Sequence, residues 1–143
     1  MEQEAQLRMG PIVVGYDGSD AARRGLLRAA LLAAGRGSLV VVAASQPAIR
    51  SAAGETLVEA SNPDETQALL EEAASLLAGR GAEFSTRAEE GAAAEVLARV
   101  ARESDAALIV VGVRGRSFVT RALVGSVAAD LVERASCDVL VAR

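Results

Sequence analysis

Short runs of residues suited to β-strands alternate along the chain with longer segments in which apolar residues recur at helical spacing. Four of the runs are apolar throughout, and such runs are typical of strands covered on both faces of a parallel sheet. A fifth, residues 83–88 (EFSTRA), is polar and suits a sheet edge. The alternation predicts a doubly wound, Rossmann-like α/β domain with five parallel strands in the order 3-2-1-4-5 and four helices. The expected strands are 11–16, 39–44, 83–88, 107–111 and 139–142.

Helical spacing marks the four segments between these runs. In the first, Ser19 is suited to be the N-cap, and Gly35 and Gly37 follow the expected end. We expect the buried faces to be Leu27, Ala30, Leu31 and Ala34; Leu69, Ala73, Leu76 and Leu77; Ala93, Leu97, Val100 and Ala101; and Val124, Val127, Ala128 and Leu131. Residues 45–62 have no clear period, which predicts either a mobile loop or a partly helical flap.

Length and composition predict one soluble domain over residues 1–143, with residues 1–9 as a flexible tail. The chain is 51% hydrophobic, which is enough for a core without covalent staples, and its single cysteine, Cys137, allows no internal disulfide. Neither a signal peptide nor a membrane-spanning stretch is visible in the sequence. We therefore expect a cytoplasmic protein without a membrane partner.

The chain contains neither histidine nor lysine, since all fifteen basic residues are arginine. Ser-His-Asp and Cys-His catalysis, His-ligated metals, Walker-type phosphate loops and Schiff-base chemistry are therefore excluded. A net charge of −4 argues against nucleic acid as a partner. Residues 106–129 nevertheless contain no acid and include Arg114, Arg116 and Arg121, which either reflects chance or favours binding of a small anion.

One motif follows the fourth expected strand. Gly112 and Gly115 stand three residues apart, and Gly125 and Ser126 follow after nine further residues. Glycines allow sharp turns and close approach of a ligand to the backbone, and a helix that begins near Ser126 would point free N–H groups at an anion. The Ser126 hydroxyl would then either donate to a phosphate or cap the helix.

This pattern, Gly-x2-Gly-x9-Gly-Ser, resembles the ATP-binding branch of the universal stress protein family. The resemblance extends over nearly the whole chain, through VVGYDGS (13–19), EEGAAAEVL (89–97), ALIVVGVRGR (107–116) and SCDVLVAR (136–143). Two positions depart from the family pattern: Val113 replaces a common Ser or Thr, and Asp138 replaces a common Pro.

The resemblance implies roles for individual residues. Asp17 matches an acidic residue that lies against the adenosine, although a plain turn before Gly18 is the alternative. Ala44 matches a backbone position that reads the adenine edge. Arg114 and Arg116 are either phosphate contacts or surface charges. The full set of expected nucleotide-binding residues is Gly15, Asp17, Ala44, Gly112, Arg114, Gly115, Arg116, Gly125, Ser126 and Val127.

The resemblance implies a regulatory protein that binds ATP, or ADP or AMP, with Mg²⁺ held mainly by the phosphates, and that has a protein partner the sequence does not name. It also implies a homodimer through the last strand, which agrees with the apolar, β-branched edge that this strand would expose. Two alternatives stay open. One is a slow ATPase or nucleotidyl-transfer enzyme, which the lack of a histidine or lysine base disfavours. The other is a dimeric interaction module without nucleotide.

Overall fold

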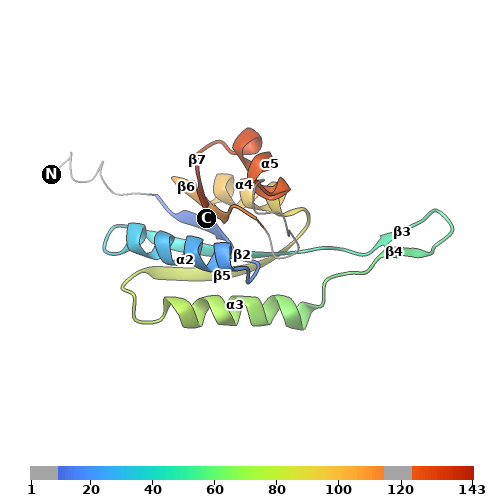
Figure 1. Ribbon diagram of the computed structural model, residues 1–143, viewed down its shortest axis with the longest axis horizontal. Coiled ribbons are helices and arrows are strands. Elements are labelled where there is room, and N and C mark those ends of the chain that lie inside the picture. The colour runs from blue at the N-terminus through green and yellow to red at the C-terminus, as the bar shows by residue number, and fades with distance from the viewer. Residues whose placement is uncertain (1–9, 115–123) are drawn as a thin grey trace.

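The computed structural model describes residues 10–114 and 124–143. Five parallel strands form one sheet in the order β5-β2-β1-β6-β7 (Figure 1). Their bounds are β1 Ile12–Gly15, β2 Ser38–Ser45, β5 Glu83–Glu90, β6 Leu108–Gly112 and β7 Asp138–Ala142. Numbered among themselves along the chain, these strands run 3-2-1-4-5, so the predicted fold class and strand order are confirmed.

Four helices in the described ranges cover the two faces of the sheet: α2 Asp20–Ala33, α3 Pro63–Leu77, α4 Ala93–Glu103 and α5 Ser126–Arg134. Helices α2 and α3 pack on one face, around Val14, Val41 and Leu39. Helices α4 and α5 pack on the other, around Val13, Val42 and Ile109. Because each strand sends alternate side chains to opposite faces, an apolar run supplies both cores at once. None of the helices in residues 10–114 and 124–143 has the length and apolarity needed to cross a bilayer.

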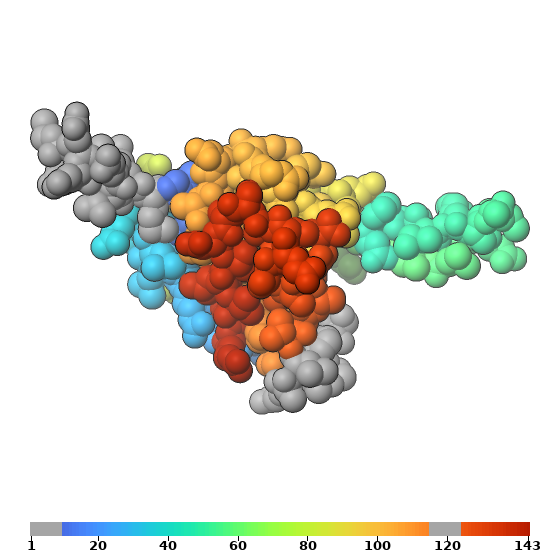
Figure 2. All heavy atoms as spheres, turned by 90° about the horizontal axis from the view of Figure 1, so that it is seen from above, coloured from blue at the N-terminus to red at the C-terminus, as the bar shows by residue number. Residues whose placement is uncertain are grey.

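Residues 45–62 contain a β-hairpin rather than helix, so the prediction of a partly helical flap is wrong. Strands β3 (Ile49–Arg50) and β4 (Thr56–Val58) pair antiparallel, and the hairpin projects from the body of the domain (Figure 2). At its base, the Gln46 N–H donates to Ser61 Oγ at 2.7 Å, and the Ser61 N–H donates to the Gln46 carbonyl at 2.8 Å. Strands this short give too few residues for a periodic pattern to appear in the sequence.

The N-cap of α2 is Ser19 as predicted, since its Oγ accepts the Ala22 N–H at 3.1 Å. Of the four residues predicted to form the buried face of α2, Ala30 is buried, whereas Leu31 and Ala34 are exposed. Leu31 is 78% exposed and Leu26 is fully buried. The buried residues of α2 are Ala21, Ala22, Gly25, Leu26, Ala29, Ala30 and Ala33. Small alanine side chains let α2 approach the sheet closely, and Leu31 and Leu32 lie on its outer side.

We predict opposite responses to truncation of two leucines in α2. Leu26→Ala leaves a cavity in a fully buried site and should lower the free energy of unfolding by about 2–5 kcal/mol. Leu31→Ala removes an exposed side chain and should change that energy by no more than about 0.5 kcal/mol. Urea denaturation of both variants checks this, and a larger loss for Leu31→Ala would contradict the observed orientation of α2.

Candidate functional site

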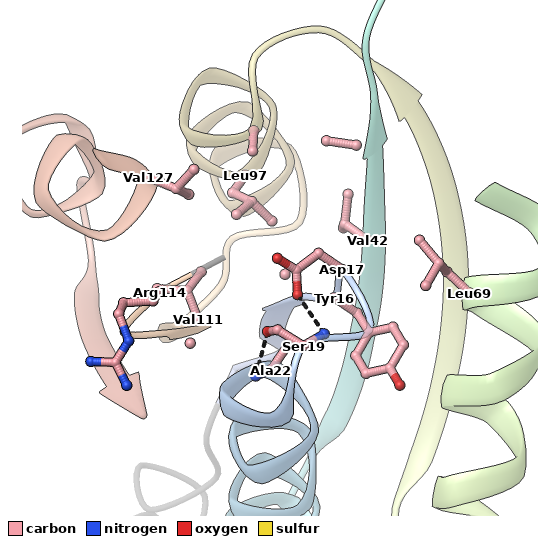
Figure 3. A pocket seen from close by; sticks show the side chains of 14 residues that line it. Tyr16, Asp17, Ser19, Ala22, Val42, Leu69, Leu97, Val111, Arg114 and Val127 are labelled. Carbon is pink, nitrogen blue, oxygen red and sulfur yellow. Dashed lines mark hydrogen bonds between the residues drawn. The ribbon is translucent and has the colours of Figure 1, made fainter. Parts of the chain in front are cut away.

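A pocket opens at the carboxyl ends of the strands, where the chain order reverses between β1 and β6 (Figure 3). At such a reversal the two neighbouring crossovers leave on opposite faces of the sheet, so the ends of the strands stay uncovered. The loop after β1, the ends of β2 and β6, and all four helices contribute to its walls. The lining residues are Gly15, Tyr16, Asp17, Ser19, Ala22, Val42, Ala44, Leu69, Ala93, Leu97, Val111, Gly112, Arg114 and Val127.

Six of the residues expected from the sequence line this one pocket, although they come from four separate parts of the chain. They are Gly15, Asp17, Ala44, Gly112, Arg114 and Val127. Gly125 and Ser126 do not line it and instead form the start of α5. Gly115 and Arg116, also expected to bind nucleotide, lie outside the described residues.

The turn between β1 and α2 is held by its own side chains. Asp17 Oδ1 accepts the Ser19 N–H at 2.9 Å, and Gly18 between them has a φ of 78°. A left-handed φ at this position is why a glycine follows Asp17. Asp17 therefore organises the turn, and it also lines the pocket (Figure 3). The two interpretations of this residue do not exclude each other.

Gly112 has a packing role that the sequence does not reveal. A Cβ placed on Gly112 would lie 2.9 Å from the Ala22 backbone nitrogen and 2.9 Å from Ala21 Cβ. The φ of Gly112 is outside the left-handed region, so a sharp turn is not what requires glycine here. The missing side chain lets the first turn of α2 rest directly on the end of β6, beside the pocket.

Both ends of the segment between β6 and α5 are fixed to the core. The Val113 N–H donates to the Ala142 carbonyl at 2.6 Å, and the Gly125 N–H donates to the Val113 carbonyl at 2.7 Å. Gly125, not Ser126, is the N-cap of α5, and within the described residues no side-chain hydrogen bond caps this helix end. The capping interpretation of Ser126 is therefore wrong.

The sequence identifies several lining residues only as core residues, or does not single them out. Val42, Leu69, Leu97 and Val111 form apolar walls on different elements (Figure 3). Helical or strand periodicity shows that a side chain faces inward, but it cannot separate a core contact from a pocket wall. These wall residues are recognised only once the structure shows that their helices and strands meet at one pocket.

Tyr16 connects the pocket to the interior. Its side chain is 3% exposed, and its hydroxyl donates a hydrogen bond to Glu72 Oε1 on α3. Arg23 Nε on α2 donates to the same oxygen at 2.9 Å. Burial, with the neighbouring Glu72 carboxylate, raises the pKa of Tyr16 to about 12. The hydroxyl therefore stays protonated and remains a donor over the physiological pH range.

The fold and the pocket together define a class: a Rossmann-like domain with a binding site at the reversal of strand order. The chain belongs to the universal stress protein family, whose model matches residues 9–143. It is 32% identical over 136 residues to universal stress protein Rv1636 of Mycobacterium tuberculosis, and this match covers 91% of the chain and 93% of that relative.

Solved structures of universal stress proteins have the same fold. One, in complex with cAMP, has a TM-score of 0.71 and 31% identity, and the match covers 95% of this chain and 98% of that one. Another, from Archaeoglobus fulgidus in complex with dAMP, has a TM-score of 0.70 and 25% identity, with 96% and 99% covered. These two relatives thus hold adenine nucleotides.

We predict that Gly112→Ala is more costly than Gly15→Ala. The Gly112 methyl would meet backbone atoms of α2, which cannot rotate away, so the free energy of unfolding should fall by about 1–3 kcal/mol. A methyl at Gly15 would lie 2.8 Å from Leu97 Cδ1, the end of a flexible side chain, and should cost less. Urea denaturation compares the two variants. An equal or larger cost at Gly15 would contradict the packing role of Gly112.

Proposed function

We propose that this protein is an adenine-nucleotide-binding regulatory protein. It binds ATP across the loops that follow β1 and β6 and acts in stress response through nucleotide-dependent conformation or partner binding, in the cytoplasm. The observation that carries the proposal is the convergence of Asp17, Ala44, Gly112 and Arg114 on one pocket at the reversal of strand order. Ligands of open α/β sheets bind at this position.

The two sides of the pocket suit the two ends of a nucleotide. Val42 and Leu69 lie on the β2 and α3 side and offer apolar surface to a base (Figure 3). Arg114 and Val127 lie on the other side, where the first turn of α5 carries no acidic residue. A guanidinium and a helix N-terminus both favour phosphate. We therefore place the adenine towards β2 and the phosphates towards α5.

The phosphate chain supplies most of the ligands to Mg²⁺ in this proposal. Within residues 10–114 and 124–143, no group of three His, Cys, Asp or Glu side chains is arranged to hold a metal ion. The full sequence supplies neither histidine nor lysine as a general base. We accordingly propose a binding protein, in which any hydrolysis of ATP is slow.

We predict that the protein binds ATP and that two substitutions weaken binding. Gly125→Val puts a β-branched side chain at the buried N-cap of α5 and should abolish binding. Asp17→Asn removes a charge in the pocket and should weaken binding roughly tenfold, the effect of a lost charged hydrogen bond. Asp64→Asn removes the same charge from the exposed first turn of α3 and serves as the control.

Isothermal calorimetry with ATP, cAMP and GTP checks this prediction. We expect both adenine nucleotides to bind more tightly than GTP, and the ratio of their affinities identifies the preferred phosphate group. Affinity for ATP that is unchanged in both Gly125→Val and Asp17→Asn would refute the proposed site.

We further propose that two copies of the chain associate through β7. Among the strands of the described residues, β7 pairs with β6 alone and forms one edge of the sheet. Its sequence DVLVA contains no proline or inward charge, and exposed apolar edges of this kind pair with other strands. Antiparallel pairing of β7 with the same strand of a second copy satisfies a two-fold axis.

We predict that Val139→Pro or Val141→Pro yields a folded monomer. The Ala142 carbonyl accepts from Val113, which follows β6, so Ala142 and Leu140 direct their backbone groups towards β6. Alternate residues point the other way, which directs the Val139 and Val141 N–H groups to the free edge. Proline removes that donor. Leu140→Pro is the matched control, because it removes a donor to β6 and should destabilise the fold itself.

Sedimentation at roughly micromolar concentration measures the outcome, since specific dimers of standard interface size are stable in this range. An unaltered chain that sediments as a monomer, with or without ATP, would contradict the proposed dimer.

A further inference from the structure

Three side chains beside the pocket form a cluster that joins three elements, and the proposed function does not use it. Tyr16 directly follows β1, Arg23 lies on α2 and Glu72 lies on α3. Glu72 Oε1 accepts from both the Tyr16 hydroxyl and Arg23 Nε. Arg23 also pairs with Asp20 at 3.1 Å. We call Tyr16, Arg23 and Glu72 the tyrosine cluster.

The cluster is linked to the pocket in two ways. The Tyr16 side chain is itself part of the lining. Leu69, which forms the α3 wall of the pocket, stands three residues before Glu72 and therefore on the same side of the helix. Figure 3 shows the Tyr16 ring directed towards α3, next to Leu69. Any shift of α3 against β1 would move Leu69 and the environment of Tyr16 together.

Both apolar packing and polar bonds hold α3 against the sheet. Leu70, Ala73 and Leu77 bury the inner face of the helix in the same core as Tyr16. Burial of apolar surface is non-directional, so it specifies the rotation and slide of a helix less sharply than a directional bond does. Hydrogen bonds to a carboxylate are directional and stronger than neutral ones. Glu72 is 39% exposed, and donors from two other elements hold it, so it links α3 to the end of β1 and to α2.

We propose that Glu72 is a positioning residue of the nucleotide pocket. Through Tyr16 and Arg23 it holds α3 so that Leu69 forms the wall that the base contacts, although Glu72 itself does not touch the ligand. The inference rests on the proposed nucleotide binding and adds a determinant of affinity that acts through another residue.

The composition of the chain supplies a specific probe. Tyr16 is the only tyrosine and there is no tryptophan, so tyrosine emission reports on this side chain alone. Glu72→Ala removes the acceptor, whereas Glu72→Gln keeps an oxygen that accepts from the Tyr16 hydroxyl. Glu71→Ala removes the same charge from an exposed neighbouring position of α3 and is the control. Tyr16→Phe deletes only the hydroxyl and leaves Glu72 paired with Arg23.

We expect Glu72→Ala to change tyrosine emission and to weaken ATP binding by at least about fivefold, as for a buried polar group that loses its partner. Tyr16→Phe should weaken ATP binding in the same direction. Glu72→Gln should restore most of the affinity, and Glu71→Ala should bind as the unaltered chain does. Because the proposed route passes through Leu69, the effects of Glu72→Ala and Leu69→Ala on affinity should be less than additive in a double-mutant cycle.

Glu72→Ala with altered tyrosine emission and unchanged affinity would overturn the inference, since the bond would then be broken without effect on the pocket. Full additivity with Leu69→Ala would overturn it as well. If Glu72→Ala does not fold, Tyr16→Phe decides through its ATP affinity and its additivity with Leu69→Ala, because this variant has no tyrosine emission to follow. A lack of ATP binding by the unaltered chain is a separate result. It would refute the proposed function, and the positioning role of Glu72, which depends on that function, would be refuted as well.

Discussion

The parallel pairing of β1 with both β2 and β6 is the constraint on which the rest of the structure depends. Val14 lies in register with Val41 of β2 and with Val110 of β6. Because β1 is central, the chain must leave it for one side of the sheet and later return on the other. The two crossovers place α2 and α4 on opposite faces, and the gap between their ends becomes the pocket. Close packing at Gly112 keeps α2 against the rim of this gap.

The sequence predicts most of this fold because strands and helices leave different periodic patterns. Residues 107–111 are apolar throughout, and all of them except Ala107 lie in β6, where Ile109 to Val111 are buried. The polar β5 lies at an edge of the sheet, as its composition indicates. The buried face of α2 was not predicted because leucine and alanine are both apolar. Apolar periodicity treats the two residue types alike. It therefore does not predict that Ala29 and Ala33 pack against the sheet while Leu31 is exposed to solvent.

The site is predicted less completely, for a different reason. Asp17, Ala44, Gly112 and Arg114, which the family resemblance implies, lie at or just after the carboxyl ends of β1, β2 and β6, where the strand order brings them together. The pocket walls formed by Leu69 and Leu97 depend on how α3 and α4 pack beside the carboxyl ends of the strands. No local sequence pattern predicts this packing. The bond between Tyr16 and Glu72 joins residues 56 positions apart, and it follows only once α3 is placed beside β1.

The central claim is that an adenine nucleotide occupies the pocket between the ends of β1, β2 and β6. Two-dimensional ¹H–¹⁵N NMR of the labelled protein, titrated with ATP, tests it most directly because each backbone amide reports separately. We expect the largest chemical-shift changes in the loop after β1, at Ala44 and at Gly112 to Arg114. Amides on the outer faces of α2 and α3 should change less. Shift changes centred on the projecting hairpin or on β7, or none at saturating ATP, would contradict the central claim.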